Sequence, residues 1–245
     1  MLNILHLDDA LVAIDKPPGL LVHRTQLDAH EEEAALQKLR DQLGRPVWPV
    51  HRLDKGTSGV LLFALDADTA SAVGQSFERG EPSKRYLALV RGWPAEDTGA
   101  IDHPLSRDPE QPSTGQPMLE ALTHWRCLAR AEWSLATDAR FPTSRFALME
   151  LRPETGRRHQ IRRHLKHMAH PIVGDATHGK GPLNRAVAAH LGVQRLWLHA
   201  LELRIWHPGN GEALVMSASP GPEWSGLPGI QTELQSITRS TSPEA

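Results

Sequence analysis

HRLDKGTSGVLLFALD (residues 51–66) places a dense polar cluster directly before an apolar run. The run VLLFAL predicts a buried β-strand, because strands covered on both faces appear as short continuous apolar segments. Six polar or charged side chains crowd residues 51–58, and Gly56 and Gly59 loosen the backbone between them. Asp54 is therefore either the cap of a turn or an acid with a chemical task, since catalytic groups often lie on loops carried by rigid elements.

The chain around this cluster is rich in predicted strands. Because they outnumber the helices and mostly follow one another along the chain, the predicted fold class is α+β with a mainly antiparallel sheet and flanking helices. Asp68 is predicted to cap the second helix, and residues 104–118, with four prolines, are predicted to form a long surface loop. Strands are predicted within residues 2–15, at 60–66 and 84–92, and in HWRCLAR, RFALMEL and LWLHALELRIW, and helices at 31–43, 69–79 and 157–169.

Composition narrows the class of protein. The chain has 245 residues and a single cysteine, Cys127, which excludes an intrachain disulfide and an all-cysteine metal site. No apolar run approaches the roughly 20 residues that a membrane helix needs. The N-terminus lacks the basic start and small-residue cleavage site of a secretory signal. We therefore expect a cytoplasmic protein that does not enter a membrane.

Charge is distributed unevenly along the chain. The formal net charge is −2, but residues 152–167, RPETGRRHQIRRHLKH, contain six Lys or Arg and one acid, a net charge of +5. The remainder is therefore at −7. A local basic stripe can bind phosphate even when the whole protein is acidic, whereas many such runs are only solvated helix faces. The stripe thus indicates an anionic partner without identifying it.

Histidines raise a rival interpretation. His159, His164, His167 and His170 lie close together, and histidines three or four residues apart on a helix can bind zinc. No HExxH pattern or second ligand cluster accompanies them, so a metal site is the minor alternative. GDATHGKG (174–181) lacks the spacing of a phosphate-binding loop, and no nucleotide cofactor is expected.

Several motifs together resemble the RluA-like pseudouridine synthase family. They occur in the order of the family, and the resemblance covers roughly residues 4–220. The pairing of HRLDxxTSG with GRxHQIR is highly specific. The motifs are IDKPPGLLVH (14–23), HRLDKGTSGVLL (51–62), KRYLALV (84–90), TGRRHQIRRHL (155–165), HPIVGD (170–175), LWLHALEL (196–203) and WHPGNGEAL (206–214).

Further features resemble the branch of this family that modifies uridine 65 of transfer RNA. They include VHRTQLD (22–28), FPTSRFALMEL (141–151) and GDATHG (174–179), with His178 where many relatives have tyrosine. The resemblance implies one catalytic domain at residues 1–225, with no N-terminal S4-type domain, and a polar, flexible tail at 226–245. It also implies the pseudouridine synthase fold, a mixed sheet with a central RNA-binding cleft.

The resemblance also implies roles for individual residues. Asp54 matches the catalytic aspartate, acting either through a covalent adduct at the sugar or by abstracting a proton to give a glycal. Arg162 is the expected counter-charge for its carboxylate, because desolvation in a closed pocket disfavours an ionised acid. Tyr86 is expected to pack against the target base and to serve in proton transfer.

Other matching residues are expected to bind the RNA. Base chemistry on folded RNA requires flipping, and Arg52 is expected to enter the helix as the uridine leaves. Leu198 is expected to pack on the base, and Lys16 to line or brace the site. Thr57 and Ser58 are expected to hold the Asp54 loop through side-chain-to-backbone hydrogen bonds. The expected phosphate contacts are Arg157, Arg158, Arg163 and Lys166.

The expected protein is thus a monomeric tRNA pseudouridine synthase that needs no cofactor or metal. Ribosomal RNA is the alternative substrate, because both kinds of enzyme share the catalytic motifs. A catalytically silent RNA-binding module and a histidine metalloenzyme are the rival classes of function. The silent module rests on the basic stripe alone.

Overall fold

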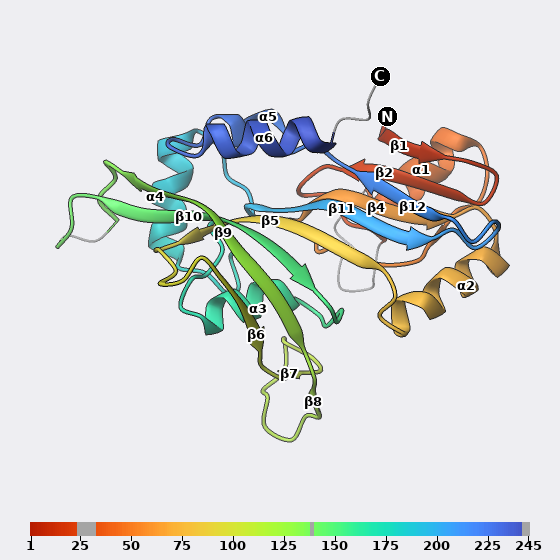
Figure 1. The fold of residues 1–245 in the computed structure, drawn as a ribbon, viewed down its shortest axis with the longest axis horizontal. Coiled ribbons are helices and arrows are strands. Elements are labelled where there is room, and N and C mark those ends of the chain that lie inside the picture. The colour runs from red at the N-terminus through yellow and green to blue at the C-terminus, as the bar shows by residue number, and fades with distance from the viewer. Residues whose placement is uncertain (24–32, 138–139, 242–245) are drawn as a thin grey trace. The chain divides into compact units, whose positions relative to one another are not determined.

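The computed structural model describes residues 1–23, 33–137 and 140–241, with side chains of the last helix described as far as residue 237. The chain divides into two compact units, and the single catalytic domain at residues 1–225 stays a prediction. The first unit is Met1–Lys84 with Ala200–Ala218, and the second is Arg85–His199 with Ser219–Ala245 (Figure 1). No helix in the described ranges is long and apolar enough to cross a membrane.

The first unit is built on a mostly antiparallel sheet. Its strands follow the order β1, β2, β4, β11 and β12, and a short β3 pairs with the end of β4. Two helices, α1 and α2, belong to the same unit (Figure 1). The bounds are β1 Asn3–Leu7, β2 Leu11–Lys16, α1 Ala35–Leu43, β3 Trp48–Pro49, β4 Ser58–Ala64, α2 Ala67–Glu78, β11 Leu198–Trp206 and β12 Ala213–Ser217.

Strand β4 is the buried centre of this unit. All seven of its residues are buried, as the apolar run predicts. The strand begins two residues before the predicted 60–66, because the register with β2 places Gly59 opposite Lys16. Its apolar side chains, with those of β2 and β11, form a hydrophobic core that also includes Val73 of α2.

The predicted starts of the first two helices were wrong. The side chain of Asp66, not Asp68, caps α2 by accepting the Thr69 N–H at 2.7 Å. Helix α1 begins at Ala35, because Ala34 has an extended backbone. The first two residues of the predicted helix at 31–43, and most of VHRTQLD, fall among residues 24–32, outside the described part of the chain.

The strands of the second unit follow the order β5, β10, β9 and β6, and each neighbouring pair among them is antiparallel. Helix α3 packs against β10, and a small two-stranded hairpin, β7–β8, lies within the predicted surface loop (Figure 1). The bounds are β5 Ser83–Arg91, β6 Thr98–Asp102, β7 Leu105–Ser106, β8 Met118–Leu119, β9 Leu122–Trp133, β10 Ser144–Pro153, α3 Gln160–His167, α4 Gly181–Leu191, α5 Pro222–Ser225 and α6 Gln231–Thr241.

The C-terminal segment contains structure where the sequence analysis expects a flexible tail. Helix α6 buries Leu234 and Ile237, and Ile230 directly before it is also buried. Trp133 of β9 donates its indole N–H to the carbonyl of Pro228 at 2.9 Å. The segment therefore packs on the second unit, and of the expected tail only residues 242–245 lie outside the described chain.

Candidate active site and nucleic-acid interface

Asp54 lies in a tight turn directly before β4. The turn is closed by the backbone, where the N–H of Thr57 donates to the carbonyl of Asp54 at 3.0 Å. Asp54 itself is half-buried, whereas the side chains of Thr57 and Ser58 are buried and anchor the turn in the unit. A short rigid turn on a buried strand is the setting in which a reactive carboxylate is held in one place.

Lys16 braces this turn from within the same unit. Its side chain is fully buried, and its ammonium group donates to the carbonyls of Pro17, Leu20 and Lys55 at 2.9, 2.8 and 3.1 Å. The N–H of Gly19 also donates to the Lys55 carbonyl. The KPPG turn and the Asp54 turn are therefore tied together at the residue that follows the carboxylate. The role of Lys16 in substrate binding stays a prediction.

His51, the first residue of the polar cluster, has a structural role. Nε2 of His51 accepts the N–H of Leu62 at 3.0 Å, and the ring stacks on Phe77. Burial, with the nearby positive charge of Lys84, lowers the pKa of His51 to about 4, so the ring is neutral.

Gly59 does not simply loosen the loop, as the sequence suggests. Its φ of +105° lies in the region that favours glycine, and a Cβ there would overlap the backbone of Ala200 in β11. Glycine at this position lets the mouth of β4 lie directly against the neighbouring strand.

Arg162 is held in the second unit by a buried ion pair. Its Nε and Nη2 donate to the two carboxylate oxygens of Asp175 at 2.7 and 2.9 Å. Arg162 is 8% exposed and Asp175 1%. Burial alone would raise the pKa of Asp175, but the hydrogen bonds and charge of Arg162 lower it below its ordinary value. Both groups are therefore charged.

Helix α3 begins later than the predicted 157–169, at Gln160. His159 adopts a left-handed backbone conformation, φ 55°, at the N-cap, and this ends the helical geometry there. The Nδ1 of His159 lies 3.2 Å from Nε2 of His178. Arg157 and Arg158 consequently belong to the loop before the helix rather than to its surface.

Tyr86 lies on β5, and Leu198 lies on β11. Tyr86 stands on β5 opposite Leu151 of β10 and is half-buried. Leu198, the first residue of β11, is buried; the boundary between the units falls inside this strand, after His199, so Leu198 belongs to the second unit. Asp54 belongs to the first unit, and Tyr86, Arg162 and Leu198 to the second, so their joint action stays a prediction.

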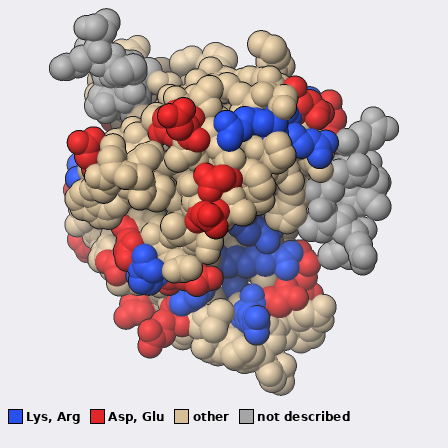
Figure 2. All heavy atoms as spheres, turned by 90° about the vertical axis from the view of Figure 1, so that its right-hand side faces the viewer, with Lys and Arg blue, Asp and Glu red and all other residues tan. Residues whose placement is uncertain are grey.

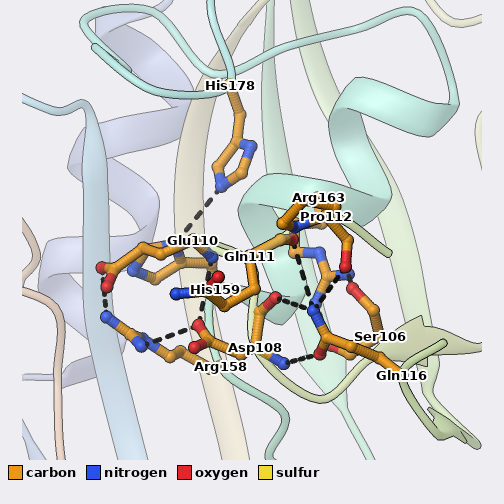
Figure 3. Close-up of polar contacts among 10 residues, drawn as sticks. All are labelled: Ser106, Asp108, Glu110, Gln111, Pro112, Gln116, Arg158, His159, Arg163 and His178. Atoms are coloured by element: carbon orange, nitrogen blue, oxygen red, sulfur yellow. Dashed lines mark hydrogen bonds and ion pairs between the residues drawn. The ribbon is translucent and has the colours of Figure 1, made fainter. Parts of the chain in front are cut away.

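The expected phosphate-binding residues have protein partners of their own. On the face shown in Figure 2, Lys and Arg side chains gather in groups bordered by acidic side chains. Figure 3 shows Arg158 forming ion pairs with Asp108 and Glu110, the former at 3.1 Å. Arg163 donates to the carbonyl and hydroxyl of Ser106 at 2.9 and 2.7 Å.

The other two residues of this group differ in exposure. Arg157 donates through Nε to the carbonyl of Glu120, and Lys166 is exposed on α3. Arg52, the residue expected to enter the RNA helix, is also exposed. The 104–118 loop therefore packs on the basic segment, which reasoning from the sequence missed. Its acidic residues, Asp108 and Glu110, were the available signal.

Asp175 is a further residue that reasoning from the sequence missed. Asp175 lies in the family motif HPIVGD and in the branch motif GDATHG, but neither motif gave it a role, although an aspartate one residue after the apolar run PIV was a visible signal. Its carboxylate also accepts the backbone N–H groups of Thr177 and His178, at 2.9 and 2.8 Å. Asp175 thus connects the guanidinium of Arg162 with the loop that carries His178.

Comparisons with known proteins agree with this arrangement. A family model described as RNA pseudouridylate synthase matches residues 10–167. The chain is 47% identical over 232 residues to tRNA pseudouridine synthase C of Vibrio cholerae, covering 93% of this chain and 94% of that protein. It is 43% identical over 232 residues to the protein of the same name from Yersinia pestis, covering 93% and 90%.

Solved structures show the same similarity. Human RNA pseudouridylate synthase domain containing 1 superposes with a TM-score of 0.71 at 25% identity, covering 100% of this chain and 97% of that one. Human RNA pseudouridylate synthase domain containing 4 gives 0.68 at 28% identity, covering 97% and 93%.

Proposed function

The chain belongs to the RNA pseudouridylate synthase family, and from this premise we propose that it converts a uridine of transfer RNA, uridine 65, to pseudouridine. The observation that carries the proposal is the identity of 43–47% with relatives named tRNA pseudouridine synthase C over more than nine-tenths of the chain. The choice of uridine 65 rests on the branch motifs of the sequence.

The reaction is an isomerisation. The bond from C1′ of the ribose to N1 of uracil breaks, the base turns, and a bond from C1′ to C5 forms. The proton lost from C5 is balanced by one gained at N1, so no oxidant or reductant is consumed. The proposal accordingly includes no cofactor and no metal.

We assign the chemistry to Asp54, Tyr86 and Arg162. The carboxylate of Asp54 acts at the sugar, as carboxylates do in retaining glycosidases. Arg162 keeps that carboxylate ionised, and Tyr86 packs on the base and moves its proton. The tight turn of Asp54 and the buried ion pair of Arg162 support these roles, since the backbone that carries Asp54 and the guanidinium group of Arg162 are each held in place.

The remaining residues bind the RNA. Arg52 fills the space left by the flipped uridine, Leu198 packs on the detached base, and Lys16 braces the catalytic turn. Arg157, Arg158, Arg163 and Lys166 hold phosphates of the tRNA. We propose that the protein acts as a monomer in the cytoplasm.

The substrate is tested by mapping pseudouridine in total RNA from a strain that lacks the gene. Loss confined to position 65 of certain tRNAs, restored by the wild-type gene, is the expected result. Loss at a ribosomal site would identify ribosomal RNA as the substrate instead. An unchanged map, together with tight RNA binding by the purified protein, would identify a catalytically silent module.

The catalytic role of Asp54 is tested by Asp54→Asn, which keeps the size of the side chain and removes its charge. We expect loss of pseudouridine formation with tRNA affinity close to wild type. Asp97→Asn serves as the control, because Asp97 is exposed and pairs with Arg130 at 2.7 Å. Full turnover by Asp54→Asn would contradict the assignment.

A further inference from the structure

The ion pair between Arg162 and Asp175 orients the guanidinium group of Arg162 as well as neutralising its charge. Two parallel hydrogen bonds, from Nε and Nη2 to the two carboxylate oxygens, set the plane of the guanidinium group. One bond alone would leave that plane able to rotate. Both partners are buried, so water does not compete for these bonds.

Asp175 is itself fixed by its own loop. Its Oδ1 accepts the N–H groups of Thr177 and His178, and its carbonyl accepts Nδ2 of Asn184 at 2.9 Å and the N–H of Gly179 at 3.1 Å. The loop cannot shift easily, because Gly174 beside Asp175 lies against the backbone of Arg195. The carboxylate is therefore a stationary reference for the guanidinium.

The same loop supports the start of α3 at a second point. The carboxylate of Asp175 accepts the backbone N–H of His178, and the ring of His178 contacts His159. His159, with its left-handed backbone, is the N-cap residue of the helix. Strained backbone of this kind is retained where the surroundings enforce it. Segment 174–179 thus holds both the side chain of Arg162 and the helix turn that carries it.

Stability gives a weak reason for such a pair. Removing two charges from water costs several kcal/mol, and apolar side chains of the same volume often stabilise a fold equally well. The ion pair between Arg162 and Asp175 is better explained by the fixed orientation that it gives to the guanidinium group of Arg162.

We propose that Asp175 is a positioning residue of the reaction, which fixes the guanidinium of Arg162 in the orientation that the catalytic step requires. The inference rests on the proposed function, since it needs Arg162 to act on the reacting carboxylate. Asp175 acts on the reaction through Arg162, and Asp175 is itself only 1% exposed.

The first experiment measures kcat and KM of the full-length protein with a tRNA substrate. For Asp175→Asn we expect kcat to fall by about 100-fold, the order of loss that follows a misplacement of about 1 Å. KM should stay within about two-fold of wild type, because ground-state binding is untouched. Wild-type kcat in Asp175→Asn would overturn the inference.

Asp175→Glu covers the case in which the asparagine variant does not fold. It retains the charge opposite Arg162 but moves the carboxylate by one methylene. Positioning predicts a kcat at least about 10-fold lower in a folded protein. A role limited to neutralising charge predicts the wild-type kcat, which would likewise overturn the inference. Thermal unfolding of each variant reports whether the fold persists.

A double-mutant cycle separates positioning from a structural role. If Asp175 acts through Arg162, then Asp175→Asn has no further effect on kcat once Arg162→Ala is present. Losses that multiply in the double variant would show that Asp175 acts independently, contrary to the inference.

Glu150→Gln is the matched control. Glu150 is also a buried carboxylate of the second unit, paired with Arg85 at 2.8 Å. Its neighbour Leu151 stands opposite Tyr86, so alternation along β10 places Glu150 on the other face of the sheet. We expect lower stability with unchanged kcat. An inactive wild-type protein would overturn the proposed function as well, whereas an active wild type with fully active Asp175 variants overturns only the inference.

Discussion

Gly59 and His51 lie on either side of Asp54 and keep the mouth of β4 in place by different physical means. Gly59 permits a close approach of two backbones, and His51 supplies an acceptor for the N–H of Leu62. Both residue types were visible in the sequence. Their tasks were not, because each depends on a strand or helix that lies elsewhere in the chain.

The close approach at Gly59 predicts a large effect of Gly59→Ala. The added methyl would overlap the backbone of Ala200, and φ of +105° disfavours any side chain. We expect a loss of about 3 kcal/mol or more in the free energy of unfolding. Gly44→Ala is the control, because Gly44 also has a positive φ, +66°, but open space around its Cβ position.

The control should lose only about 1–2 kcal/mol, the cost of a left-handed residue with a side chain. Urea unfolding of the two variants measures the difference. Equal losses would show that strain of the backbone, rather than the contact with Ala200, requires glycine at position 59.

His51 predicts a pH dependence of stability. Its pKa is lowered from 6.5 to about 4, so the unfolded chain binds a proton more readily between these values. Its contribution is complete above the unfolded pKa and is lost as the pH falls toward 4. By linkage, we expect the His51 contribution to fall by about 2 kcal/mol between pH 7 and pH 5.

The matching variant is His51→Gln, whose amide oxygen can accept the Leu62 N–H without titrating. Urea unfolding at both pH values should show a smaller decrease for this variant than for wild type. The same decrease in both proteins would mean that other groups cause the dependence.

At the scale of elements, hairpin β7–β8 and the start of α3 form one assembly. Figure 3 shows the loop around Asp108 and Glu110 held against Arg158, and the loop start at Ser106 held by Arg163. Two carboxylates beside Arg158 more than offset its charge. If Arg158 binds a tRNA phosphate, as proposed, these acids compete with it.

This competition predicts that Asp108→Asn combined with Glu110→Gln tightens tRNA binding. We expect the Kd for tRNA to fall by about 2- to 5-fold at low salt, as expected when partly exposed ion pairs are removed. Asp97→Asn, which removes an acid distant in sequence from α3, should leave Kd unchanged. Weaker binding by the double variant would show that the hairpin instead holds Arg158 in its binding position.

Helix α6 shows a signal that the sequence analysis overlooked. Ile230, Leu234 and Ile237 recur at the spacing of one helix face, and all three are buried. The polar side chains between these three residues led to the prediction of a flexible tail at residues 226–245. A short amphipathic helix gains its stability from the surface on which it packs, so composition alone was a poor guide.

At the scale of the whole molecule, local groups of charged side chains matter more for RNA binding than the net charge of the chain. The chain carries a formal net charge of −2, and on the face shown in Figure 2 its basic side chains form separate groups bordered by acidic side chains. Association with RNA must therefore depend on local patches and on salt, because an overall attraction is absent. The proposed phosphate contacts all lie in the second unit, at the start of α3 and along it.

The sequence by itself determined the family, the mainly antiparallel α+β class and the buried strand beyond Asp54. These follow from contiguous motifs and from apolar periods, which are local properties of a chain. The tertiary structure alone decided that Asp175 orients Arg162, that the 104–118 loop occupies Arg158 and Arg163, and that Gly59 meets Ala200. These contacts join residues 13 to 141 positions apart, and no local period specifies which distant side chains will meet once both are buried.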